Sequence, residues 1–192
     1  MKHSFLRALC VSVVICSLGV LGIARAERFL TPQEAIRACF PQGGSVEAVN
    51  LRLKPEEIKT VERETKQKLR KTDWRVWLAK PGGVLMVDQV IGKHEFIDYA
   101  VAISTNGTVL QVEILEYREH YGGEVRQPKW RDQFRGKSAR DPLKIGGDVY
   151  NITGATLSCR HVTEGVKKLL AIFEVAVRPR LLPGGGLREP AA

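Results

Sequence analysis

The sequence predicts an α+β domain in which an antiparallel sheet of about four or more strands packs with helices. Two changes in the spacing of apolar residues lead to this prediction. Between residues 74 and 117 the apolar side chains follow the period of strands and are rich in valine and isoleucine. From residue 157 to residue 177 they follow the helical period, so a long C-terminal helix is expected.

Two helices are expected before the strands. The motif Thr-Pro-Gln-Glu at residues 31–34 is a capping box with proline at the first helical position, so a short helix should begin there. A second helix should begin after Lys54 and continue to about Arg70, with one narrow apolar stripe and charged residues on its other faces. We therefore assign residues 27–79 to an N-terminal helical and linker part of the domain.

The strands should form two hairpins. A Lys-Pro-Gly-Gly break at residues 80–83 separates the first two strands, and Asn106-Gly107 separates the last two. Asn-Gly between apolar runs is the strongest short signal for a hairpin turn. The expected strands are residues 74–79, 84–91, 96–104 and 108–117.

Two irregular regions flank the C-terminal helix. Residues 117–147 lack a clear period, and a loop of this length inside a compact domain is usually functional or disordered. Its aromatic residues, which include Trp130 and Phe134, argue against disorder. Residues 178–192 are rich in proline and glycine, so we expect a disordered tail.

The first 26 residues have the composition of a secretory signal peptide. Lys2 and Arg7 provide a basic start, residues 8–23 are almost wholly apolar, and Ala24-Arg25-Ala26 fits the small-x-small cleavage pattern. The apolar run is shorter than the roughly 20 residues of a membrane span, which favours a cleaved signal over an uncleaved anchor. The protein is therefore expected to be exported, and to be membrane-anchored if the signal is retained.

The charge of the chain is mildly basic. The formal net charge is +9, and removal of the signal with its three basic residues leaves 27 basic and 21 acidic residues, a charge of +6. Because acids and bases are interspersed, a solvated mixed surface is expected and nucleic-acid binding is not.

Cysteines and histidines are few after the signal. Cys39 and Cys159 could pair in an oxidising compartment, but two cysteines do not make a disulfide scaffold. His94, His120 and His161 do not show the spacing of metal ligands, so no metal site is expected.

The stretch Thr-Gly-Ala-Thr-Leu-Ser, just before the C-terminal helix, is the candidate functional motif. A helix N-terminus offers unpaired N–H groups and the positive end of the helix dipole, which favour a bound phosphate. The motif is not a P-loop, because no Gly-Lys-Ser/Thr ending follows. A plain helix cap by one of its hydroxyls is the alternative. The motif consists of Thr153, Gly154, Ala155, Thr156, Leu157 and Ser158.

This stretch resembles the S/T-G-A-T-x-S/T signature of the FMN-binding domain family. The family includes periplasmic flavoprotein subunits of sodium-pumping NADH:quinone reductases and of Rnf-type complexes, and small stand-alone exported proteins. The resemblance implies that Thr156 carries FMN through a phosphoester bond installed by a flavin transferase of the ApbE type. It also implies a periplasmic protein that passes electrons to or from a membrane-bound or periplasmic redox partner.

Other segments extend the resemblance over residues 80–177. Residues 119–122, with Glu119 and Gly122, resemble the Glu-x-x-Gly step of the family, and residues 130–137 resemble its W-x-x-x-F-x-G-K segment. The strand pair at 97–116 is similar to part of the family's sheet. The chain departs from the pattern six positions before Thr156, where an acidic residue is frequent. Tyr150 stands there, and Asp148 is the nearest acid.

The resemblance implies an FMN pocket around Thr156. The phosphate should lie near the N–H groups of residues 157–159, and glycines should allow the flavin to approach the backbone. Trp130 as a core residue and Lys137 as a solvated charge are the plainer alternatives. Cys159 could be a redox thiol because a helix N-terminus lowers thiol pKa, and structural burial or a bridge to Cys39 is the alternative. The candidates for the rest of the pocket are Glu119, Gly122, Gly123, Trp130 and Lys137.

Two other functions stay open at this point. One is a non-redox exported interaction module in which the Thr-Gly-Ala-Thr turn only caps a helix. The other is a flavin-dependent reductase, although the chain shows neither a nicotinamide-binding fingerprint nor an evident acid–base pair. An electron carrier or redox subunit is favoured over a self-contained enzyme.

Overall fold

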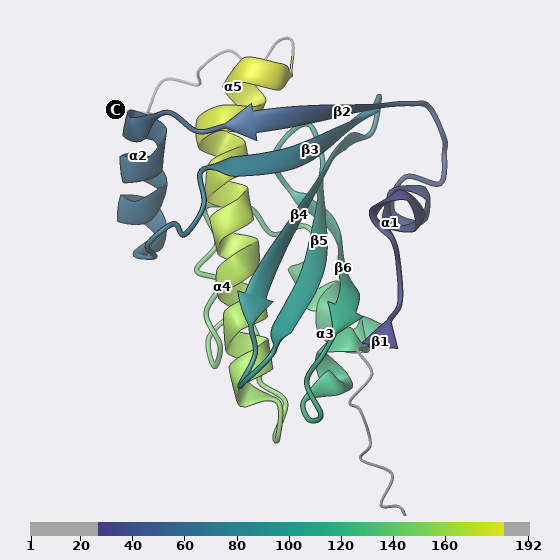
Figure 1. Cartoon of the computed structure of the whole chain (residues 1–192), viewed down its shortest axis with the longest axis vertical. Helices are drawn as coiled ribbons and strands as arrows, with labels where there is room; N and C mark the ends of the chain where they lie inside the picture. The colour runs from purple at the N-terminus through teal and green to yellow at the C-terminus, as the bar shows by residue number, and fades with distance from the viewer. Residues whose placement is uncertain (1–26, 183–192) are drawn as a thin grey trace, which may run out of the picture.

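The computed structural model describes residues 27–182 and consists of one antiparallel sheet with helices on both faces (Figure 1). The strand order is β1-β6-β5-β4-β3-β2. The expected signal peptide at residues 1–26 lies outside the described residues, as do residues 183–192. The strands are β1 (Glu27–Arg28), β2 (Ser45–Arg52), β3 (Asp73–Lys80), β4 (Gly83–Ile91), β5 (Phe96–Ile103) and β6 (Val109–Tyr117).

The helices are mostly short, with one long exception near the C-terminus. Among the described residues, no helix is both long and apolar enough to cross a membrane. The helices are α1 (Pro32–Cys39), α2 (Pro55–Thr65), η1 (Gly123–Arg126), α3 (Pro128–Arg131), η2 (Asp132–Phe134), α4 (Thr156–Ile172), η3 (Phe173–Val177) and α5 (Arg178–Leu181).

The four predicted strands are confirmed to within one residue at each end. The turn between β5 and β6 explains why Asn-Gly is a reliable signal. Gly107 has a φ of 88°, a backbone conformation that suits glycine, and its N–H donates to the carbonyl of Ser104 at 3.0 Å. The predicted fold class, an antiparallel sheet packed with helices and a long C-terminal helix, is therefore confirmed.

The central strands are buried on both faces. One face carries α2 and α4 and includes Val76, Met86 and Tyr99, all less than 1% exposed. The other face is covered by α1 and includes Leu85 and Ala100. This two-sided burial explains the nearly continuous apolar runs in β4 and β5.

The capping box at the start of α1 is confirmed. Thr31 Oγ1 accepts a hydrogen bond from the N–H of Glu34 at 3.2 Å, and the Glu34 carboxylate accepts one from the N–H of Thr31 at 2.7 Å. The two bonds satisfy backbone groups that the first turn of a helix leaves unpaired.

Two features of the N-terminal part differ from expectation. The helix expected to reach Arg70 ends at Thr65, because Lys66 adopts a left-handed conformation with φ of 58° and the Glu62 carboxylate accepts the N–H of Leu69. Strand β2 was not predicted. It is an edge strand with one buried residue, so its own sequence carries little periodic signal and its pairing with β3 defines it.

The C-terminal helix extends further than predicted. Helical backbone runs from α4 through the π-helical turn η3 into α5, so residues 178–181 of the expected disordered tail are helical. Arg178 pairs with Glu174 at 2.8 Å, and Arg180 pairs with Glu57 of α2 at 3.1 Å. These ion pairs hold the last helical turn against the domain.

Asp88 of β4 is a buried charge beneath α4. Its side chain is 3% exposed, and its two oxygens pair with Lys71 Nζ at 2.6 Å and Lys168 Nζ at 2.7 Å. Burial acts to raise the pKa of Asp88, but the two lysines outweigh it and lower the pKa below its usual value. The carboxylate therefore ties the 66–72 segment and α4 to the sheet.

We expect Asp88→Asn to lower the free energy of unfolding by about 2 kcal/mol at neutral pH, because both lysines lose their partner. Since the folded pKa is lowered, this stabilisation is present above the unfolded pKa of about 4 and is lost as the pH falls through the folded pKa. Urea unfolding of both proteins should show the full difference at pH 7 and a progressively smaller one as the pH falls below about 4. Asp132→Asn, which removes an exposed pair with Arg135, is the control and should change stability by less than about 0.5 kcal/mol. An equally small effect at position 88 would contradict the prediction.

Candidate functional site

The Thr-Gly-Ala-Thr turn leads directly into α4. Gly154 has a φ of 88°, so a side chain there would be strained, and the turn is closed by a hydrogen bond from the N–H of Ala155 to the carbonyl of Ile152 at 3.0 Å. Ala155 occupies the N-cap position, and no side chain caps the helix. Thr156 is the first helical residue.

The hydroxyl groups of this turn are used for other contacts. Thr156 is exposed, and its Oγ1 accepts a hydrogen bond from Asn151 Nδ2 at 3.0 Å. Ser158 is buried, and its Oγ lies 3.1 Å from the Tyr117 hydroxyl. Neither residue caps α4, so the plain-cap interpretation of the motif does not describe this turn.

A cavity of about 270 Å³ opens at Thr156. Three segments line it: the start of α4, the hairpin between β4 and β5, and the loop after β6. A second cavity, of about 420 Å³, adjoins it, because Glu119, His120 and Tyr121 line both. The first cavity is lined by Lys93, His94, Glu119, His120, Tyr121, Gly154, Ala155, Thr156, Leu157 and Ser158.

Glu119 holds the β4–β5 hairpin beside the site. Its Oε1 accepts hydrogen bonds from the N–H groups of His94 at 2.5 Å and Glu95 at 2.9 Å. Partial burial raises the pKa of Glu119, but these backbone hydrogen bonds outweigh it and lower the pKa overall. A Cβ at Gly92 would lie 2.6 Å from the same oxygen, so only glycine allows the carboxylate to come this close.

Gly122 brings the loop after β6 against the start of α4. Its φ is 82°, and a Cβ there would lie 3.0 Å from the Tyr117 hydroxyl and 3.1 Å from Ser158 Oγ. The Tyr117 hydroxyl donates to the carbonyl of Tyr121 at 2.5 Å, which fixes the path of the loop. Gly122 and Gly123 both line the second cavity.

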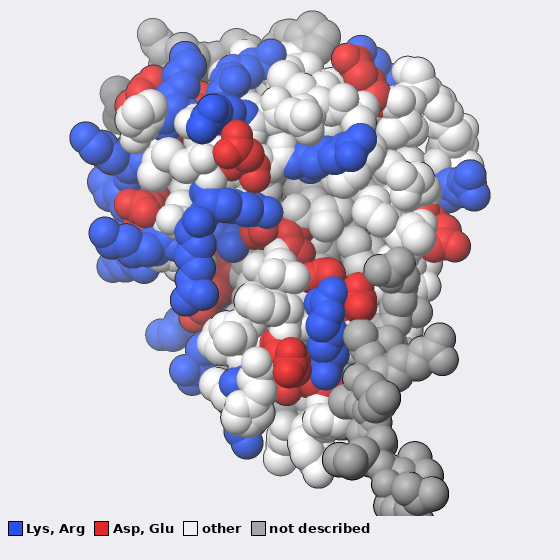
Figure 2. Space-filling view, viewed as in Figure 1, with Lys and Arg blue, Asp and Glu red and all other residues white. Residues whose placement is uncertain are grey.

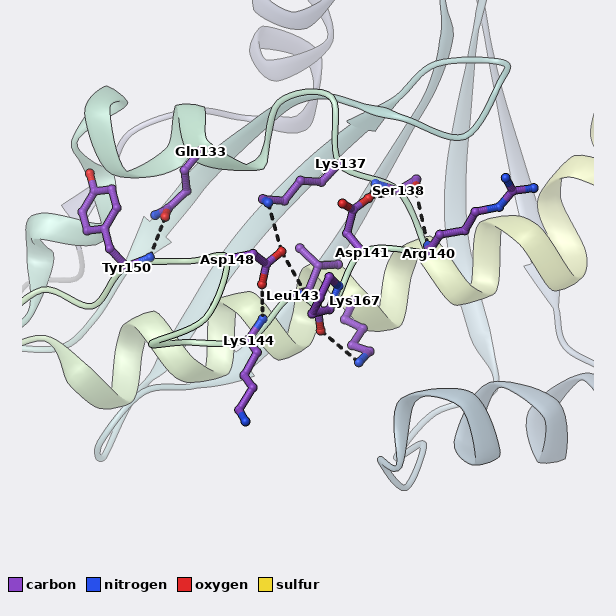
Figure 3. A network of polar contacts seen from close by, with 11 residues as sticks. Gln133, Lys137, Ser138, Arg140, Asp141, Leu143, Lys144, Asp148, Tyr150 and Lys167 are labelled. Atoms are coloured by element: carbon purple, nitrogen blue, oxygen red, sulfur yellow. Dashed lines mark hydrogen bonds and ion pairs between the residues drawn. The ribbon is translucent and has the colours of Figure 1, made fainter.

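Trp130 and Lys137 lie away from both cavities. Trp130 is 1% exposed in the main core, where its Nε1 donates to the carbonyl of Tyr150 at 3.0 Å. Lys137 Nζ pairs with Asp148 at 2.9 Å (Figure 3). The structure therefore brings most of the predicted pocket residues together. Trp130 and Lys137 instead make contacts that stabilise the fold. Thr153 is exposed in the turn and does not line the Thr156 cavity.

Asp148 organises the loop before the turn. Its carboxylate accepts the N–H groups of Leu143 at 3.2 Å and Lys144 at 2.8 Å in addition to the Lys137 pair (Figure 3). Burial raises the pKa of Asp148, but these hydrogen bonds outweigh it and lower the pKa. Because its oxygens are already bound within the loop, Asp148 is poorly placed to replace the acid that the family often has at the position of Tyr150.

Neither described cysteine has the character of a redox thiol. Cys39 and Cys159 are unpaired, and Cys159 is fully buried. Burial raises the pKa of the Cys159 thiol, and it raises that of Cys39 to about 12. Desolvation outweighs the backbone hydrogen bonds that lower the Cys159 pKa, so the structure favours the alternative of structural burial for this thiol.

Lys93 and His94 were missed as candidate residues. They belong to the turn of the β4–β5 hairpin, about 60 residues before Thr156 in the chain. The sequence shows the hairpin but not that its tip folds against the start of α4. Gly92, next to Lys93, was the only local signal of a close backbone approach.

The segment that contains the Thr156 turn is similar to a known family of flavoprotein domains. Residues 92–171 match the family described as the FMN-binding domain. This segment is therefore similar to FMN-binding domains, and FMN is its cofactor.

Relatives from two organisms support this assignment. One subunit of the Na⁺-translocating ferredoxin:NAD⁺ oxidoreductase complex of Acetobacterium woodii is 28% identical over 41% of this chain and 42% of its own length. One subunit of the ion-translocating oxidoreductase complex of Escherichia coli is 33% identical over 54% of this chain and 58% of its own length. The matches thus span about half of these relatives.

The crystal structure of Shewanella oneidensis NqrC matches with a TM-score of 0.49 and 20% identity, covering 78% of this chain and 86% of that one.

Proposed function

We propose that this protein is an exported electron carrier in which FMN is attached covalently to Thr156 through a phosphoester. The observation that carries the proposal is the position of the Thr156 side chain. It is exposed at the first turn of α4, lines a cavity and does not serve as a helix cap. A transferase needs such an accessible hydroxyl.

The start of α4 suits a bound phosphodiester. The first N–H groups of a helix have no intrahelical partner, and the helix dipole favours negative charge there. The approach at Gly154 is open, because no atom from beyond its two chain neighbours lies within 4 Å of a Cβ built on it. Esterification needs a flavin dinucleotide as donor: the bond from Thr156 Oγ1 to the flavin-side phosphorus forms as the pyrophosphate P–O bond of the donor breaks, the nucleoside monophosphate leaves, and the hydroxyl proton is released.

The other residues of the cavity shape and retain the cofactor. Lys93 and His94 place positive or polar groups beside Thr156, and Glu119 holds their hairpin in position. Tyr121 is 85% exposed between the two cavities and offers an aromatic face to a flat ring. FMN itself supplies the one- and two-electron chemistry.

Export explains why the link should be covalent. A flavin that dissociates outside the cytoplasm is lost by dilution, and an ester bond prevents this loss. The N-terminal 26 residues carry a signal-like pattern, which supports a periplasmic location. The relatives are named as subunits of ion-translocating oxidoreductase complexes, which supports a membrane-bound redox partner for this chain as well.

Maturation with a flavin transferase tests the proposal directly. We expect the full chain, co-expressed with a periplasmic transferase of the ApbE type and then denatured, to show in-gel flavin fluorescence and the mass increment of one FMN ester. The same chain expressed without the transferase is the control and should have the mass of the bare polypeptide. A bare mass in both samples would contradict covalent attachment.

A further inference from the structure

A third cavity, larger than the two near Thr156, is a groove on the side of the sheet that carries α2 and α4. Its volume is about 620 Å³. One wall is the segment 67–71 between α2 and β3, and another is one side of α4. The end of β4 and the start of β5 line the end of the groove that lies nearest the hairpin turn.

Positive charge dominates this groove. Lys68, Arg70, Lys71 and Lys168 line it against two acids, Asp88 and Glu164. Lys71 and Lys168 both pair with Asp88. Lys68 and Arg70 are exposed and have no ion pair with any residue in the described part of the chain. Figure 2 shows Lys and Arg side chains gathered on the left of the view, over the side of α2 and α4.

The groove and the Thr156 cavity share the β4–β5 hairpin as a wall. Ile91 and Phe96, at the ends of the hairpin strands, line the groove, whereas Lys93 and His94, in its turn, line the cavity. His161 Nδ1 lies 2.5 Å from the carbonyl of Ile91, so α4 holds the hairpin between the two sites. A molecule in the groove therefore lies next to the residues that surround Thr156.

Apolar side chains are exposed at the hairpin end of the groove. Ile91 is 41% exposed and Phe96 is 44% exposed. Apolar contacts beside a charged rim are typical of protein interfaces, in which the charges steer the encounter and the apolar residues bury area. A groove, unlike a flat face, admits an extended segment along its length.

We propose that this groove is the docking site for an acidic segment of a redox partner protein. Carboxylates of the segment pair with Lys68 and Arg70, and an apolar side chain of the segment covers Ile91 and Phe96. The inference rests on the proposed function, because a partner that exchanges electrons must approach the cofactor. Docking here places the partner against the hairpin beside Thr156.

Binding of an acidic peptide tests the groove. The probe is a dye-labelled hexapeptide of four glutamates and two phenylalanines, titrated with the full flavin-loaded chain and followed by fluorescence anisotropy. We expect saturable binding that weakens as salt is raised. The double variant Lys68→Ala/Arg70→Ala should weaken binding by about fivefold or more. Arg37→Ala/Lys129→Ala removes the same charge from exposed positions outside the groove and should bind as the unmodified chain does.

Three outcomes separate this inference from its alternatives. Equal binding by both double variants would overturn it. Sedimentation with vesicles of phosphatidylcholine and phosphatidylglycerol that requires Lys68 and Arg70, without peptide binding, would also overturn it in favour of a lipid surface. Chain that lacks FMN should bind the peptide as well as loaded chain, because the groove does not include Thr156. Failure of flavin attachment and failure of docking are therefore distinguishable.

Discussion

In a Thr156→Val variant matured with the flavin transferase, we expect covalent flavin to be lost completely while the domain stays folded. Valine keeps the branched shape of threonine but has no oxygen to esterify. The side chain is exposed, and the substitution removes the hydrogen bond from Asn151. The free energy of unfolding should therefore change by less than about 1 kcal/mol.

The matched control for this variant is Thr105→Val. Thr105 is an exposed threonine in the turn between β5 and β6, outside the Thr-Gly-Ala-Thr motif and both cavities near Thr156. It should keep full in-gel flavin fluorescence and the mass of the FMN ester, with unfolding curves measured for both variants. Fluorescence that survives denaturation in Thr156→Val would show that another residue carries the flavin.

The sequence predicted the framework of this site because its signals are local. Gly154 and the small residues around it mark a turn, the apolar period after Thr156 marks a helix, and Asn106-Gly107 marks a hairpin. Each depends on backbone preferences that a few neighbouring residues decide. Strands β3 to β6 and helix α4 were therefore located correctly even without knowledge of their partners.

The parts that could not be predicted depend on contacts between distant segments. The β4–β5 hairpin places Lys93 and His94 at Thr156 only because Glu119, 25 residues from His94, binds its backbone. The sequence around Trp130 does not tell whether its ring stacks on a ligand or fills the core. The burial of the side chain in the structure shows that it fills the core. Strand β2 likewise forms because its residues pair with β3, which is distant in the sequence.

Gly165 packs directly against the sheet, and Gly165→Ala should be strongly destabilising. A Cβ at this position would overlap the Tyr99 hydroxyl, and it would lie 2.7 Å from Tyr99 Cζ and 3.0 Å from a Val90 methyl group. Tyr99 is completely buried and cannot swing into solvent. Alanine gains about 1 kcal/mol in helix propensity, but overpacking at a fixed ring costs more, so we expect a net loss of about 2 kcal/mol.

Urea unfolding measures this loss, and two variants separate crowding from other causes. Glu164→Ala changes the exposed neighbour on α4 and should alter stability by less than about 0.5 kcal/mol. In Tyr99→Phe the nearest overlapping atom is absent, so Gly165→Ala should cost less in that background than in the unmodified chain. An equal cost in both backgrounds would rule out contact with the hydroxyl as the cause. Because α4 also carries Thr156 at its first turn, a helix pushed off the sheet should be flavinylated less completely, which links core packing to the cofactor site.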